Sequence, residues 1–100
     1  RTNEQNALMW ALLDDISGQV QWPVNGRLEW LDSEDWKHII SGGLHREQRI
    51  AQGINGGWVV LGRRTSKMTE AEMADLLELI QAFGAEHGVR FSAPEYREAA

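Results

Sequence analysis

The chain has 100 residues and a net charge of −5, and its 42% hydrophobic and 25% charged residues are typical of one folded domain. It contains no cysteine, which excludes disulfides, thiol catalysis and cysteine-based metal sites. No apolar stretch approaches the roughly 18–20 residues that cross a membrane, and no secretory leader precedes the first predicted helix. We therefore expect a cytoplasmic protein without a membrane partner.

The first predicted helix runs from Thr2 to Gly18. Thr2 and Gln5 fit a capping box, in which the side chain of each residue bonds the backbone N–H of the other. An apolar stripe follows at four-residue spacing, formed by Leu8, Leu12 and Ile16. Trp10 lies about 200° around the helix from Leu8, so we expect it to be the best candidate for an exposed tryptophan.

Short strands are predicted on both sides of two turn motifs, Asn25-Gly26 and Asn55-Gly56-Gly57. Asparagine and glycine together favour the tight reversals that join antiparallel strands. The predicted strands are residues 20–22, 27–30, 50–54 and 58–61. A further short strand is expected at residues 89–92.

Acidic residues mark the start of the second predicted helix. Asp32 is its expected N-cap, and Glu34 and Asp35 in the first turn suit the positive end of the helix dipole. Three carboxylates so close in sequence could also hold a divalent cation, as in a metal-dependent nuclease. Because capping alone explains acids at this position, we expect no metal and no catalytic residue here.

The third predicted helix begins at Thr69, which forms a second capping box with Glu72, and ends near Gly88. We expect an α+β fold of three principal helices with a β-hairpin and short additional strands. One domain should cover residues 1–92, followed by a polar tail at 93–100. The side chains expected to dominate the core recur at helical spacing: Leu8, Leu12, Ile16, Trp36, Ile40, Leu76, Leu77, Ile80 and Phe83.

Charge is distributed unevenly along the chain. Residues 46–67 carry a net charge of +4, whereas residues 1–45 and 68–100 carry −4 and −5. The basic loop before the third helix supplies charged and hydroxyl donors from Arg63, Arg64, Thr65, Ser66 and Lys67. Such donors beside a helix N-terminus suit phosphate groups, and a nearby exposed tryptophan could stack on unpaired bases. A solvated loop paired with the acidic segments is the alternative.

Several segments in order resemble the NinB family of phage recombination mediators, which includes the lambda Orf protein. The matching segments are RTNEQN (1–6) with Trp10, QVQW (19–22), WLDSEDWK (30–37), VVLG (59–62), TSKM (65–68) and LLELIQAFG (76–84) with Glu86, Gly88 and Val89. Family members carry a further β-containing segment before the first of these motifs. The resemblance therefore implies that the chain lacks that segment or is a fragment of a longer protein.

The resemblance implies a non-enzymatic, dimeric phage or prophage protein that binds single-stranded DNA and needs no cofactor. Such a protein acts with the host single-strand-binding protein to bring a recombinase or annealing protein onto the strand. By resemblance, Gln5, Trp10 and Lys67 contact DNA, with Trp10 stacking and Gln5 hydrogen-bonding. Arg63 and Arg64 are added from the charge of the loop. Two alternatives stay open, an adaptor that binds single-strand-binding protein without strong DNA contact and a divalent-metal nuclease.

Overall fold

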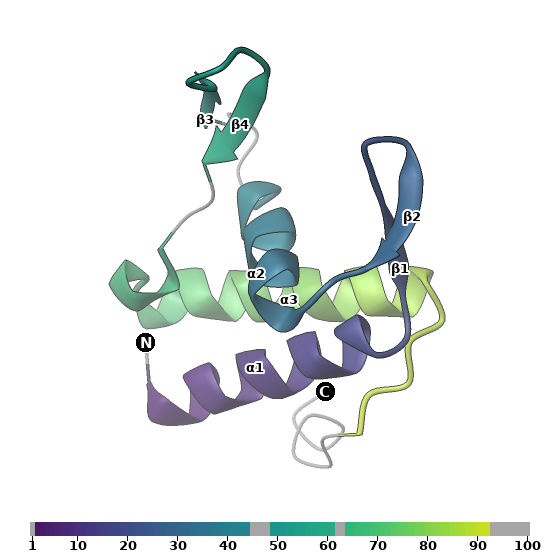
Figure 1. The fold of residues 1–100 in the computed structure, drawn as a ribbon. Helices are drawn as coiled ribbons and strands as arrows, with labels where there is room; N and C mark the ends of the chain where they lie inside the picture. The colour runs from purple at the N-terminus through teal and green to yellow at the C-terminus, as the bar shows by residue number, and fades with distance from the viewer. Residues whose placement is uncertain (1, 45–48, 62–63, 93–100) are drawn as a thin grey trace.

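The computed structural model of the protein describes residues 2–44, 49–61 and 64–92 (Figure 1). Within these ranges the helices are α1 (Asn3–Ser17), α2 (Ser33–Gly42), the 3-10 turn η1 (Thr65–Lys67) and α3 (Glu70–Glu86). The strands are β1 (Gln21–Val24), β2 (Arg27–Trp30), β3 (Arg49–Gln52) and β4 (Trp58–Leu61). The expected α+β class is confirmed. In the described ranges, every helix is too short or too polar to cross a membrane.

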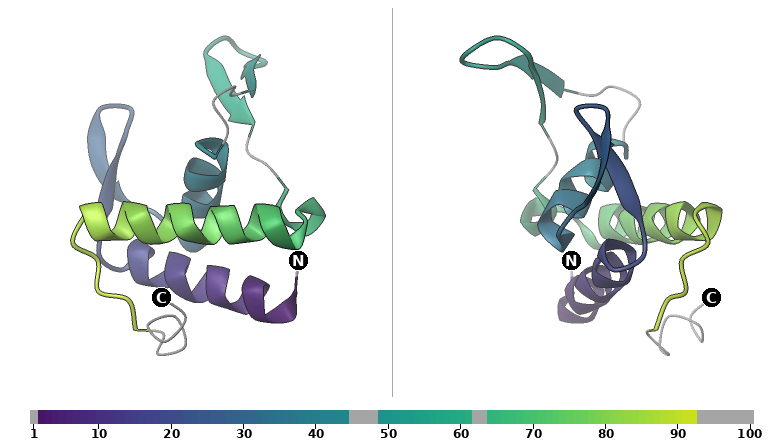
Figure 2. Two further views of the ribbon diagram at one scale, coloured as in Figure 1. Left: turned by 180° about the vertical axis from the view of Figure 1, so that it is seen from behind. Right: turned by 45° about the vertical axis from the view of Figure 1, so that its right-hand side comes forward.

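Helices α1 and α3 lie side by side and run in the same direction (Figures 1 and 2). Both begin with the predicted capping boxes, formed by Thr2 with Gln5 and by Thr69 with Glu72. A capping box satisfies backbone N–H groups that have no partner within the helix. At this end the Gln5 Nε2 also donates to the backbone oxygen of Glu70 at 3.0 Å, which ties the two helix starts together.

Helix α2 packs against this pair and completes the hydrophobic core. Seven of the nine predicted core side chains are buried, whereas Leu8 and Phe83 are only half-buried and pack at its border. The core extends further than predicted because α1 contacts both α2 and α3 and so buries more than one stripe. The additional buried side chains are Met9, Leu13, Val20, Met68, Met73 and Phe91.

The β1–β2 hairpin is anchored to the helices by an aromatic cluster. The Trp22 ring centroid lies 5.4 Å from that of Trp36 on α2 and 5.3 Å from that of Phe83 on α3. Aromatic pairs at such distances and tilted angles stabilise by more than their buried area alone. This hairpin turns at Asn25 and Gly26, both with positive φ, which is the geometry that the Asn-Gly pair predicts.

The β3–β4 hairpin is a separate two-stranded sheet and shares no hydrogen-bonded edge with β1–β2. The described glycines Gly56 and Gly57 at its tip have positive φ, as expected for the predicted reversal. Both hairpins project from the same side of the α1–α3 pair, with α2 between them (Figure 1). The predicted strands are therefore present as two independent arms.

The expected strand at residues 89–92 is wrong, because this segment returns along α1 without a partner strand. Its backbone bonds are made by side chains: the Gln19 amide pairs with the N–H and C=O of Arg90 at 2.8 Å, and Asp15 accepts from the Ser92 N–H at 2.9 Å. Phe91 is buried against Gly84, which has no side chain to obstruct its ring. The predicted tail at 93–100 lies outside the described residues.

Candidate nucleic-acid interface

The basic loop before α3 forms the 3-10 turn η1. The backbone N–H of Lys67 donates to the oxygen of Arg64 at 3.2 Å, and that of Met68 donates to Thr65 at 3.1 Å. Arg64, Ser66 and Lys67 are exposed, whereas Thr65 is buried with 5% of its surface accessible. The turn thus presents two cations and one hydroxyl to solvent just before α3. Arg63, the remaining predicted residue, lies outside the described residues.

Gln5 lies at the same end of the molecule as η1, because its side chain bonds the first residue of α3. Its Oε1 also accepts from the Thr2 N–H at 3.1 Å, so both ends of the amide are used within the protein. The structure therefore brings the starts of α1 and α3 together, far apart as they are in sequence. Both helices direct the positive ends of their dipoles toward this end.

Trp10 is not exposed as predicted, since its ring is half-buried and packs at the border of the core. The Lys37 Nζ of α2 lies 5.4 Å from its ring centroid, within the range of a cation–π interaction. The same ammonium pairs with Glu34 at 3.1 Å. The helical wheel placed Trp10 away from one apolar stripe, but that side of α1 faces α2.

The exposed tryptophans are instead Trp30 and Trp58, and sequence reasoning missed both. Trp30 on β2 is 61% exposed and Trp58 on β4 is 74% exposed. Trp58 begins the apolar run Trp58–Leu61, a pattern equally typical of a buried strand. The available signal was its position within the basic segment 46–67.

The acids considered for a nuclease have structural roles. Asp32 Oδ1 accepts from the Asp35 N–H at 2.9 Å and so caps α2, and Glu34 pairs with Lys37. Across the described ranges no group of three or more histidine, cysteine, aspartate or glutamate residues is placed to hold a metal ion. These contacts are the capping and surface roles that the sequence favoured.

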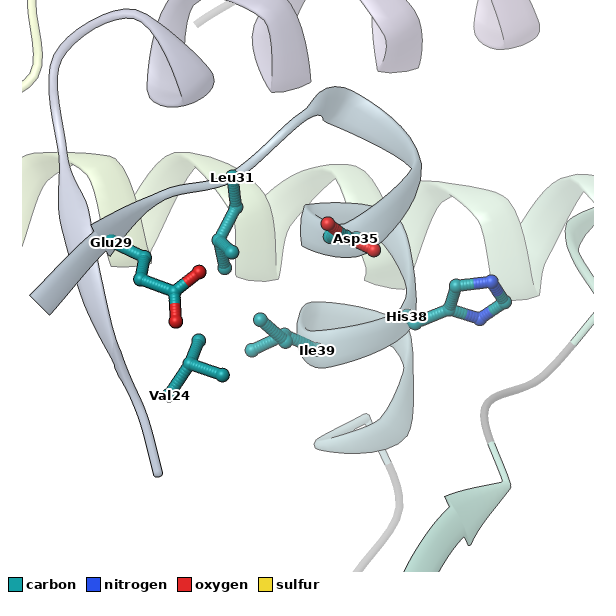
Figure 3. A pocket seen from close by; sticks show the side chains of 6 residues that line it. All are labelled: Val24, Glu29, Leu31, Asp35, His38 and Ile39. Carbon is teal, nitrogen blue, oxygen red and sulfur yellow. The ribbon is translucent and has the colours of Figure 1, made fainter. Parts of the chain in front are cut away.

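An open pocket of about 350 Å³ lies between the β1–β2 hairpin and α2. The apolar side chains of Val24, Leu31 and Ile39 and the Glu29 carboxylate point into it (Figure 3). Asp35 stands on the facing helix, and His38 points away (Figure 3). An apolar pocket with two carboxylates at its rim is unfavourable for phosphate, so this pocket is not a candidate for binding nucleic acid.

The fold and these surfaces define a small α+β protein that exposes cations at η1 and indoles on its two hairpins. The family model for NinB protein matches residues 1–92. Over 92 residues the chain is 46% identical to the NinB proteins of Escherichia phage lambda and Salmonella phage P22, and to a P21 prophage-derived NinB of Escherichia coli O6:H1. The chain belongs to the NinB family, as its motifs predicted.

The match covers 92% of this chain and 60% of the lambda protein, so the chain spans about three fifths of that relative's length. A solved NinB structure superposes with a TM-score of 0.72 and 47% sequence identity, covering 99% of this chain and 67% of that one.

Proposed function

We propose that this protein binds single-stranded DNA and serves as a phage or prophage recombination mediator. In this role it cooperates with the single-strand-binding protein of the host cell to bring a recombinase or annealing protein onto the strand. It acts as a non-enzymatic homodimer in the cytoplasm. The observation that carries the proposal is the position of Arg64 and Lys67, exposed at the edge where α1 and α3 both begin.

Physical chemistry favours phosphate at this edge. Arginine offers paired donors to phosphate oxygens, and lysine adds a compact charge. Two helix N-termini add partial positive charge, although Glu4 in the first turn of α1 and Glu70 and Glu72 in that of α3 oppose it in part. Glu72 is turned back onto the N-cap by its bond from the Thr69 N–H at 3.3 Å. The proposed contacts are Gln5, Trp10, Arg63, Arg64, Thr65, Ser66 and Lys67.

Among the described members of this set, Arg64, Ser66 and Lys67 are exposed. Thr65 and Gln5 support it from inside: the first is buried beneath the turn, and the second holds the two helix starts in register. Trp10 would have to offer its open edge while Lys37 covers the ring face. We therefore expect the two cations to contribute more to affinity than Trp10 does.

The decisive test is a charge reversal at Lys67, measured by fluorescence anisotropy of a labelled strand of about 30 nucleotides. Lys67→Glu should weaken binding about tenfold at low salt and reduce the slope of log affinity against log salt by about 0.7 for the lost phosphate contact. Arg27→Glu is the matched control, an exposed cation of β2 in the acidic part of the chain. Equal effects of the two substitutions would remove η1 from the interface.

An adaptor for single-strand-binding protein is the second candidate, because both hairpins expose large apolar side chains that suit a protein partner. It would be supported by a Lys67→Glu variant that fails to bind bare DNA and still binds the partner protein. Sedimentation of the unchanged chain tests the proposed homodimer.

A further inference from the structure

One face of the β3–β4 hairpin presents an apolar surface that the described residues leave open. The register places Ile50 opposite Val60 and Gln52 opposite Trp58, so these four side chains share one face, the Trp58 face. Ile50, Val60 and Trp58 are 53%, 51% and 74% exposed. Contiguous exposed apolar side chains of this kind indicate a binding surface.

The position of this face relative to the body is fixed at one end. The Val60 side chain lies beside Gly42, the last residue of α2, which sets the base of the hairpin against the helix. Trp58 begins β4 next to the turn, so its indole stands toward the tip. The tryptophan is therefore the member of the face most accessible to a ligand.

The charge around the hairpin favours a polyanion. Arg64 and Lys67 follow β4, and Arg49 begins β3, where the register places it on the face opposite Trp58. All three lie in residues 46–67, the segment with a net charge of +4. Within the described ranges none of these three cations is in an ion pair. An exposed aromatic ring in the same segment as unpaired cations is the combination of groups that binds single-stranded nucleic acid without reading its sequence.

The other exposed tryptophan gives an internal comparison. Trp30 is nearly as exposed as Trp58 and also lies on a two-stranded hairpin. It lies in residues 1–45, the segment whose net charge is −4. Phosphate approaching Trp30 would be repelled, so exposure alone does not make an indole suitable for DNA.

We propose that Trp58 is a base-stacking residue and that single-stranded DNA extends from Arg64 and Lys67 onto the Trp58 face. This inference rests on the proposed function and adds to it a second contact region, on an arm that projects from the helices (Figure 2). The cations hold the phosphates and the indole holds a base. The two contributions to affinity can therefore be measured separately, with ligands that have or lack bases.

The test compares two labelled ligands of equal length, a thymidine strand of about 30 nucleotides and the same backbone without bases. Trp58→Ala should weaken binding of the thymidine strand about fivefold or more, the effect of losing one stacked base. It should leave the affinity for the abasic strand and the salt dependence unchanged, because tryptophan carries no charge. Trp58→Phe should retain most of the binding, and Trp30→Ala should alter neither ligand.

Three results would overturn the inference. The first is equal affinity of Trp58→Ala and Trp30→Ala for the thymidine strand. The second is that Trp58→Ala loses as much affinity for the abasic strand as for the thymidine strand. The third is a change in the sedimentation of Trp58→Ala, which would show that Trp58 contacts another protein chain. An unchanged chain that binds neither ligand would refute the proposed function as well. Circular dichroism of each variant confirms that the helices are intact.

Discussion

The two hairpins have nearly the same local structure and different relations to the rest of the protein. Each pairs two four-residue strands and carries one exposed tryptophan. The β1–β2 hairpin also sends Trp22 into the cluster with Trp36 and Phe83, whereas β3–β4 meets the helices mainly through the end of α2. A hairpin of two strands is marginal alone, so anchoring decides which arm is part of the folded body.

The largest expected effect comes from removing the anchor of the first hairpin. Trp22→Ala should lower the free energy of unfolding by about 2–3 kcal/mol, because it removes the ring contacts that Trp22 makes with Trp36 and Phe83. Trp58→Ala should change it by less than about 0.5 kcal/mol, since that ring is mostly in water. Urea unfolding followed by circular dichroism measures both. Similar decreases in the free energy of unfolding for the two variants would show that both hairpins are equally integrated into the folded body.

A second substitution tests how closely the body is packed where the chain returns along α1. A Cβ at Gly84 would overlap the ring of Phe91, so Gly84→Ala should destabilise by about 1–3 kcal/mol. Gly18→Ala is the control, because a Cβ there meets only the Asp14 and Asp15 backbone oxygens at 3.7 and 4.0 Å. If Gly84→Ala left the free energy of unfolding unchanged, the Phe91 ring would be able to move aside without destabilising the fold.

The smallest expected effect on stability lies at the tip of the second arm. A Cβ at Gly53 would overlap the backbone oxygen of Gly56, so Gly53→Ala should distort the β3–β4 turn. Because this arm adds little to the core, global unfolding should shift by less than about 0.5 kcal/mol. Amide exchange of Ile50 and Val60 should nevertheless become faster. A cooperative loss of helix in Gly53→Ala would contradict the separation of arm and body.

Local patterns predicted much of this fold. The capping boxes of Thr2 and Thr69 and the Asn25-Gly26 turn were predictable because each depends on residues within a few positions of each other. The 89–92 segment was not, because its backbone partners are side chains of Asp15 and Gln19 about seventy residues away in the chain. Alternation in a short apolar segment carries no information on such partners.

The candidate site was predicted in part. Its cations could be found from charge alone, and Arg64 and Lys67 are exposed. The closeness of Gln5 to this turn could not be found, because it depends on how α1 packs on α3. The exposed indoles of Trp30 and Trp58 were also missed. Trp10 was expected at the surface because a helical wheel describes one helix alone, whereas Lys37 of α2 covers its ring.

The pairing of α1 with α3 has a consequence for how the chain folds. Each hairpin can close within microseconds, because its two strands are adjacent in sequence. Helix α1 cannot meet α3 until residues 18–69 have been made and folded back, a long loop to close. During synthesis at about 5–20 residues per second, the side of α1 that packs on α3 stays uncovered for seconds. Of the described helices, α1 is thus the one that depends longest on protection from aggregation.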